Sequence, residues 1–272
     1  MEPCETRLFI SDVDGTLLNA QKELSPATVQ AVHDLQSAGI LFSLVSQRPL
    51  QGLKKIAEIL KLHNSCAALN GGVITDSALT VISEKHVRSS LLQGIVGTIE
   101  RYGLDPWIYT RTRWYVSRCD GPHVLHEADV LGFSPVPFET LSELSEPVIK
   151  ITAVSDHYDQ VNDCERYLKQ HFGNQLAIVR SLANHLDISH PDANKGSAVI
   201  SIAGQLGIPL NQVATAGDGE NDIPMFRVSG FSIAMGQGSA EVHRAAAFTT
   251  TSNAQDGLAW AINDLILKHC AK

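Results

Sequence analysis

Short apolar runs alternate with amphipathic stretches over the first 75 residues. Between the first two runs, Val29, Val32 and Leu35 recur at the spacing of one helix face, and Gly39 follows as a stop signal. The apolar runs themselves have the length of buried strands and lie at residues 8–10, 40–45 and 66–69. Strand, helix, strand, helix, strand in this order predicts parallel βαβ units.

The middle of the chain has a different pattern. Residues 107–109 and 114–116 alternate around a short polar link, as the two strands of a hairpin do. Further strands are expected at 148–154, 176–179 and 185–188, and helices at 87–102 and 157–171. Antiparallel strand pairs mixed with helices indicate an α+β segment.

After this segment the βα alternation returns. A helix is expected from Lys195, strands at 213–216 and 233–235, and a closing helix over 254–269. We therefore predict a discontinuous α/β domain made of residues 1–82 and 190–272, with an α+β domain of residues 83–189 inserted between its halves.

Composition narrows the function classes. The 272 residues have a formal net charge of -8, which disfavours a binder of nucleic-acid backbones. No apolar run approaches the about 18 residues that cross a bilayer. The acidic N-terminus does not resemble a secretory signal, and the five cysteines form no CxxC pair, as expected of free thiols: Cys4, Cys66, Cys119, Cys164 and Cys270. We expect a cytoplasmic monomer or homodimer with no membrane or nucleic-acid partner.

The first apolar run ends in Asp12-Val13-Asp14-Gly15-Thr16-Leu17. Residues two apart in a strand point to the same side, so Asp12 and Asp14 could approach one site beyond the strand end. Open α/β sheets bind ligands at that edge. Paired carboxylates favour Mg²⁺, and an aspartate can attack phosphorus. Taken alone, the segment could equally be a solvated turn.

This segment resembles the first motif of the haloacid dehalogenase-like superfamily of phosphohydrolases. The resemblance continues in order at Ser46, which follows the second apolar run, at Lys195 in NKGSAV, and in Gly217–Met225, GDGENDIPM. Asn70-Gly71 and Lys195-Gly196 are similar to the Cof-type subgroup, which has a type IIB cap. The resemblance implies a Rossmann-like, three-layer core with a parallel sheet and an inserted α+β cap.

The resemblance also implies a role for each matching residue. Asp12 would be the nucleophile, and Asp14 the general acid and base. Mg²⁺ would be held by Asp12, by the backbone carbonyl of Asp14 and by Asp218, with Asp222 on a metal-bound water or behind it. Phosphate or substrate would be bound by Ser46, Gln47, Arg48, Asn70, Gly71, Lys195 and Asn221. The acidic segment around Asp218 could instead be only a helix-capping turn.

One position departs from the family pattern of Thr-Gly-Arg after the second strand. The chain has Ser46-Gln47-Arg48, so a glutamine replaces the glycine that lets the backbone approach phosphate closely. The Gln47 side chain must then point away from the phosphate, and we expect an altered rate or substrate range. Arg48 could bind a second anionic group or form a surface salt bridge.

The resemblance favours a phosphatase of small phosphorylated metabolites, with sugar phosphates first, acting through an aspartyl-phosphate. A phosphomutase of the same superfamily and a non-catalytic phosphate-binding regulator are the alternatives. The cap would select the substrate, because every ester shares the same phosphate. Candidates in the cap are aromatic, arginine and histidine residues: Tyr109, Arg111, Arg113, Trp114, Arg118 and His123. They could equally form an exposed hairpin with half-buried aromatics.

Overall fold

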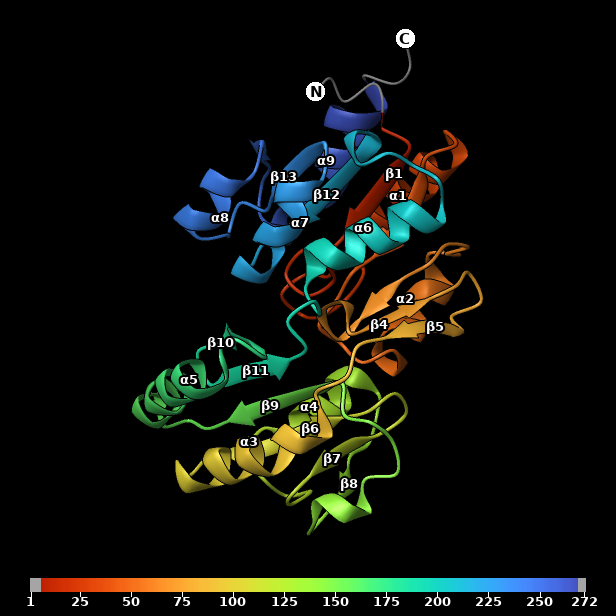
Figure 1. The fold of residues 1–272 in the computed structure, drawn as a ribbon. Helices are drawn as coiled ribbons and strands as arrows, with labels where there is room; N and C mark the ends of the chain where they lie inside the picture. Colours follow the sequence, from red (N-terminus) through yellow and green to blue (C-terminus); the bar gives the residue numbers. More distant parts are fainter. Residues whose placement is uncertain (1–5, 269–272) are drawn as a thin grey trace.

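The computed structural model describes residues 6–268 and contains a parallel central sheet (Figure 1). Its five strands lie in the order β14-β13-β12-β1-β2, and every neighbouring pair is parallel. The strands are β1 (Leu8–Ser11), β2 (Leu41–Leu44), β12 (Val213–Gly217), β13 (Phe231–Ala234) and β14 (Phe248–Thr249). Cys4, Cys270 and the last residue of the predicted closing helix lie outside the described residues.

Helices cover both faces of this sheet and make three layers. Phe9 and Phe42 pack with the buried side chains of α1 and α9, whereas Leu8 and Ile10 pack with those of α6 and α7. This alternation follows from the two-residue period of a strand. The helices of this part are α1 (Pro26–Ser37), α2 (Gln51–Ile59), α6 (Lys195–Gln205), α7 (Ile223–Val228), α8 (Ala240–Ala245) and α9 (Gly257–Ala261).

The third predicted strand is shorter than expected and lies at the edge of the sheet. Only β3 (Ala67–Ala68) is extended, and a single parallel bridge from Ala67 to Val45 connects it to the strand before it. It pairs antiparallel with β4 (Val73–Thr75), which pairs with β5 (Val81–Glu84). The apolar pattern did not predict β4 and β5.

The predicted closing helix is interrupted. A 3₁₀ turn at Asn253–Gln255 is followed by Asp256, whose φ of 53° is left-handed and stops helical continuation. Only then does α9 begin, and a π-helical stretch continues it over Ile262–Leu267. Within the described part of the chain, no helix is both long enough and apolar enough to cross a bilayer.

The inserted segment forms a second sheet with the order β10-β11-β9-β6-β7-β8. Its pairs are antiparallel except β7 with β8, and the hairpin of β6 and β7 is confirmed. The strands are β6 (Asp105–Tyr109), β7 (Trp114–Val116), β8 (Val136–Pro137), β9 (Lys150–Val154), β10 (Ala177–Leu182) and β11 (His185–Ser189). The predicted fold class is thus confirmed, while the exact domain boundaries stay a prediction.

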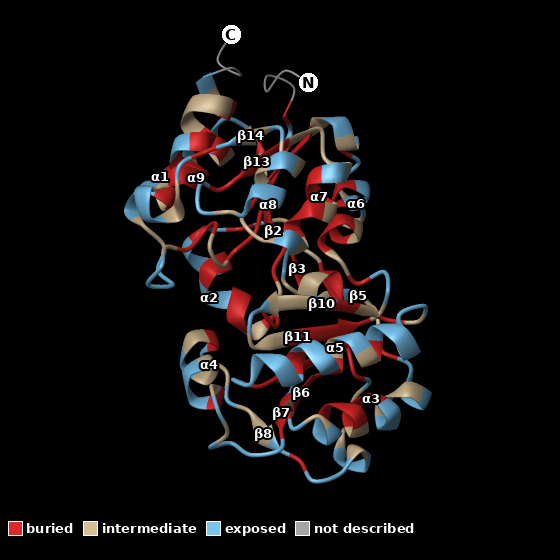
Figure 2. Cartoon of the chain, turned by 90° about the vertical axis from the view of Figure 1, so that its left-hand side faces the viewer, coloured by how far each residue is buried: buried red, intermediate tan, exposed pale blue. Residues whose placement is uncertain are grey.

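Two helices cover the outer face of the second sheet. Ile108, Ile151 and Leu186 point to that face and pack in one cluster with residues of α3 (Ser89–Arg101) and α5 (Tyr158–Phe172). Figure 2 shows the exposed sides of these two helices turned outward and β11 buried behind them. The other face of the sheet turns toward the first sheet, together with α4 (Val124–Leu131).

Candidate active site

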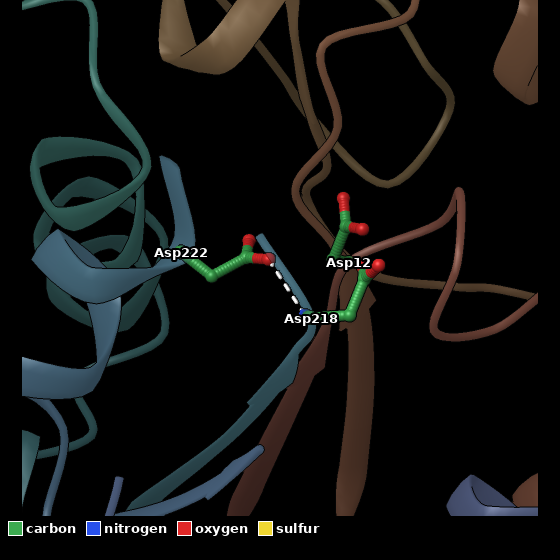
Figure 3. A group of neighbouring side chains, drawn as sticks. All are labelled: Asp12, Asp218 and Asp222. Carbon is green, nitrogen blue, oxygen red and sulfur yellow. Dashed lines mark hydrogen bonds between the residues drawn. The ribbon is translucent and has the colours of Figure 1, made fainter. Parts of the chain in front are cut away.

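Three aspartates meet where the central strands end (Figure 3). Asp12 directly follows β1 and Asp218 directly follows β12, its parallel neighbour, so both side chains leave the sheet at the same edge. Asp222 joins them from the short turn after β12. One carboxylate oxygen from each residue lies within 4.8 Å of the others. The two distant motifs of the sequence therefore form one acidic cluster.

Lys195 binds this cluster from the first turn of α6. Asn194 caps the helix by accepting a hydrogen bond from the Ser197 amide, which fixes where the lysine emerges. Only 1% of Lys195 is exposed, and its Nζ donates to Asp12 Oδ1 at 2.5 Å and to Asp222 Oδ1 at 2.6 Å. A buried ammonium thus bridges the predicted nucleophile and the acidic motif.

The charges of the cluster do not balance. Burial raises the pKa of Asp12 well above its usual value, Lys195 opposes this, and the neighbouring aspartates add to it. Burial and the charge of Asp222 also raise the pKa of Asp218. Burial lowers the pKa of Lys195, but the two carboxylates outweigh it and the net shift is upward. One lysine faces three carboxylates, so the site favours a further cation.

The donor set fits Mg²⁺, which prefers oxygen ligands. Asp12 and Asp218 have carboxylate oxygens available to a cation at the strand ends. Asp222 is more fully engaged, because its Oδ2 accepts the amide hydrogens of Asp218 and Gly219, both at 2.9 Å, while Oδ1 binds Lys195. Its role behind a metal-bound water remains a prediction.

Asp14 lies at the mouth of the same site and is held by two cations. Arg48 donates to it from Nε at 2.6 Å and from Nη2 at 2.7 Å, and Lys22 donates from Nζ at 2.9 Å. Burial raises the pKa of Asp14, but these contacts outweigh it and lower the pKa to about 2. Arg48 thus forms the salt bridge considered for it, but Arg48 is buried and the pair does not lie at the surface as predicted. Sequence reasoning did not single out Lys22.

The residues predicted to bind phosphate divide into two groups. Ser46 is fully buried and its Oγ accepts from the Arg48 amide at 3.1 Å. The backbone N–H of Asn70 donates to the backbone carbonyl of Ser46 at 2.8 Å, and the side chain Nδ2 of Asn221 donates to Asn70 Oδ1 at 3.4 Å. Of the predicted set, Gln47, Arg48, Lys195 and Asn221 line the cavity described next, whereas Ser46, Asn70 and Gly71 do not.

Gln47, the departure from the family pattern, lies between the two sheets. Its carbonyl accepts from Lys150 Nζ of the inserted segment at 3.4 Å. The side chain Oε1 is buried and has no hydrogen-bond partner among the described residues. The position thus contacts the inserted segment and also lines the cavity.

A cavity of about 380 Å³ separates the acidic cluster from the second sheet. The inserted segment contributes a floor to this cavity, which we call the cap floor: Trp107, Tyr109, Lys150, Thr152, His185 and Asp187. Helix α4 adds Glu127, whose pKa is raised by burial. Two of the expected cap residues, Tyr109 and His123, also line the cavity.

The other expected cap residues do not line the cavity. Arg111 pairs with Glu84, and Arg118 forms an exposed pair with Asp120 at 3.3 Å. Trp114 is buried against Trp107, with ring centroids 5.1 Å apart. The arginines near the hairpin therefore match the alternative of an exposed hairpin, but its aromatic residues Tyr109 and Trp114 are buried rather than half-buried.

Sequence reasoning missed most of the cap floor. Its signal was present in two apolar strands that contain polar residues at every second position: Lys150 and Thr152 in β9, and His185 and Asp187 in β11. A charged residue at a buried strand position is unusual unless it has a partner. That pattern indicates a polar inner face.

The chain matches known proteins over nearly its whole length. Residues 9–262 match the family of haloacid dehalogenase-like hydrolases. A Haemophilus influenzae protein provisionally named a phosphatase is 30% identical over 95% of this chain and 97% of its own. A Bacillus subtilis protein named 5-amino-6-(5-phospho-D-ribitylamino)uracil phosphatase is 25% identical over 98% of both chains.

A solved structure shares the architecture. The subclass IIB sugar phosphatase BT4131 superposes with a TM-score of 0.84 at 21% identity, covering 95% of this chain and 98% of that one. At that identity the likeness concerns the fold, and it agrees with the cap type predicted from the motifs. The match over residues 9–262, together with the 30% identical relative, shows that the chain belongs to the haloacid dehalogenase-like hydrolase family.

Proposed function

We propose that this protein is a Mg²⁺-dependent phosphatase of small phosphorylated metabolites, with sugar phosphates first, and that Asp12 forms the aspartyl-phosphate. The observation that supports this most is the buried contact of Lys195 with both Asp12 and Asp222, beside the cavity that Asp12 and Lys195 line. It places a cation beside the nucleophile, where a phosphoryl oxygen would need one. The names of the curated relatives, which are phosphatases, agree with this reaction.

In the proposed reaction, an Asp12 oxygen attacks phosphorus and the bond from phosphorus to the ester oxygen breaks. Asp14 gives a proton to the leaving oxygen, then removes one from the water that hydrolyses the aspartyl-phosphate. Mg²⁺ at Asp12, Asp218 and the Asp14 carbonyl would reduce the repulsion between the nucleophile and the phosphate.

The contacts of Asp14 set a condition on its proton transfer. With a pKa of about 2, its carboxylate is ionised at neutral pH and ready to act as a base. To act as an acid it must first be released by Arg48 and Lys22. An anionic substrate competes for those two cations, so substrate binding itself provides the release.

The test is phosphate release from glucose 6-phosphate, ribose 5-phosphate and an aryl phosphate, measured with Mg²⁺ and with chelator. We expect metal-dependent turnover that Asp12→Asn abolishes and that Asp34→Asn, a change at an exposed helix position, retains. Folded wild-type protein that binds Mg²⁺ but releases no phosphate from any ester would contradict the proposal. Transfer of phosphate between positions of a sugar without release would point to a phosphomutase.

A further inference from the structure

The cap floor contains two buried, oppositely charged side chains that the phosphoryl chemistry does not use. Asp187 is 4% exposed and Lys150 is 6% exposed, yet both line the cavity. Their contact is long, 3.4 Å from Lys150 Nζ to Asp187 Oδ1. Burying two charges is costly unless their hydrogen-bonding capacity is used.

Strand register explains why these side chains are together. In β9, Lys150 and Thr152 point to the inner face, and the antiparallel pairing sets Thr152 opposite Asp187 of β11 and opposite Trp107 of β6. Lys150 is set opposite Tyr109 in the same way. The group therefore rests on regular strands and is positioned rigidly rather than by loops.

One carboxylate oxygen of Asp187 is occupied and the other is not. Thr152 Oγ1 donates to Oδ1 at 2.7 Å, and Lys150 approaches the same atom. Oδ2 is buried without a hydrogen-bond partner among residues 6–268. Rotation about the Cβ–Cγ bond presents either oxygen to the cavity without a backbone movement. An unpartnered carboxylate oxygen at a cavity wall requires a donor.

Lys150 also retains capacity to bind a ligand. Its Nζ has three hydrogens to donate, while its contacts with Gln47 O and Asp187 Oδ1 are both 3.4 Å long. It also lies 4.8 Å from the centre of the Tyr109 ring. Beside this pair, burial lowers the pKa of His185 to about 4, so its ring is neutral at pH 7.

We propose that Asp187 and Lys150, with Thr152 orienting the carboxylate, bind hydroxyl groups of the substrate's leaving group and so select polyhydroxylated phosphate esters. This rests on the proposed phosphatase function. A hydroxyl donates one hydrogen bond and accepts others, so neighbouring hydroxyls satisfy Asp187 and Lys150 together. An aryl leaving group offers no donor to Asp187 and leaves that buried oxygen unsatisfied, which penalises its binding.

The test compares kcat/KM for polyhydroxylated esters, namely glucose 6-phosphate, sorbitol 6-phosphate and ribose 5-phosphate, with kcat/KM for phenyl phosphate in the same preparation. The ratio is independent of the fraction of folded enzyme, so partial instability of a variant does not obscure it. Asp187→Asn replaces the free acceptor by a donor, and we expect the ratio to fall by about tenfold to a hundredfold. Lys150→Met tests the other charge. Asp163→Asn, at an exposed position on α5, is the matched control and should retain the wild-type ratio.

Each outcome decides the proposal. Unchanged ratios in both Asp187→Asn and Lys150→Met would overturn it, as would a wild type that hydrolyses phenyl phosphate but none of the polyhydroxylated esters. If Asp187→Asn lowers kcat/KM for glucosamine 6-phosphate but not for glucose 6-phosphate, Asp187 binds an ammonium group instead and the proposal is overturned. Failure of the proposed function is distinguishable, because the wild type would then release phosphate from no ester, including phenyl phosphate.

Discussion

Replacing Lys195 with methionine tests the electrostatics of the acidic cluster directly. Methionine has a similar length and no charge, so the change removes the ammonium that lies 2.5 Å from Asp12 and 2.6 Å from Asp222. Both carboxylates are almost fully buried and would lose their partner. Breaking a buried ion pair in this way costs about 3–5 kcal/mol. That is a large fraction of the stability of about 5–15 kcal/mol typical of a protein.

The assay is urea unfolding at pH 7, followed by circular dichroism, with chelator and with Mg²⁺. In chelator we expect the free energy of unfolding to fall by about 3–5 kcal/mol. Mg²⁺ should reduce this loss of unfolding free energy relative to the wild type, because a cation bound by Asp12 and Asp218 replaces part of the lost positive charge. Phosphate release should be lost in both conditions, since the proposed phosphate-binding cation is gone.

The matched control is Lys169→Met. Lys169 is exposed on α5 and contacts Glu165 at 2.7 Å, four residues away on the same helix. Such a surface pair contributes about 0–1 kcal/mol, so this variant should be nearly as stable as the wild type. The reasoning is refuted if Lys195→Met and Lys169→Met lose equal stability in chelator, or if Mg²⁺ stabilises Lys195→Met no more than the wild type.

Two further predictions concern Asp14 and the turn after it. A folded pKa of about 2 against the ordinary 3.8 means that Asp14 stabilises the protein above about pH 4 and that this contribution is lost as the pH falls toward 2. Arg48→Met should therefore lower the free energy of unfolding at pH 7 by up to about 2 kcal/mol relative to the wild type, and by less near pH 2. An equal loss at both pH values, measured by thermal unfolding, would contradict this. Gly15→Ala would place Cβ 2.3 Å from Asp218 Oδ2 at a φ of +85°, so both activity and melting temperature should fall sharply. Gly39→Ala, with a φ of +80° and no atom within 4 Å of its Cβ, should cost only the backbone strain of about 1 kcal/mol and retain activity.

The catalytic half of the molecule could be predicted from the sequence because its motifs are local. Asp12 and the Asp218 motif each follow an apolar strand, and parallel strands end at a common edge. The main sheet therefore brings them together with no further information. The prediction of the third strand was less accurate, because β3 leaves the parallel sheet to pair with β4 and because β4 and β5 are short.

The cap floor could not be predicted in the same way. Asp187, Thr152 and Trp107 come together through two antiparallel registers between strands about forty residues apart, and a shift of one residue in either would turn a side chain to the other face. Lys22 likewise reaches Asp14 from a loop whose path the apolar pattern does not determine. The interrupted closing helix depended on the left-handed conformation of a single residue, Asp256.

The strict alternation of the cap sheet has a consequence for how the protein can change. In β6, β9 and β11, Ile108, Ile151 and Leu186 pack under α3 and α5, while their neighbours Trp107, Thr152 and Asp187 lie on the reverse side. Substitutions at the polar cavity-side positions Lys150, Thr152, His185 and Asp187 therefore remove no member of the hydrophobic cluster under α3 and α5, whereas Trp107 and Tyr109 are buried members of the other cluster. A combinatorial library restricted to those four polar positions would sample new substrate preferences without altering the hydrophobic packing on either side of the sheet.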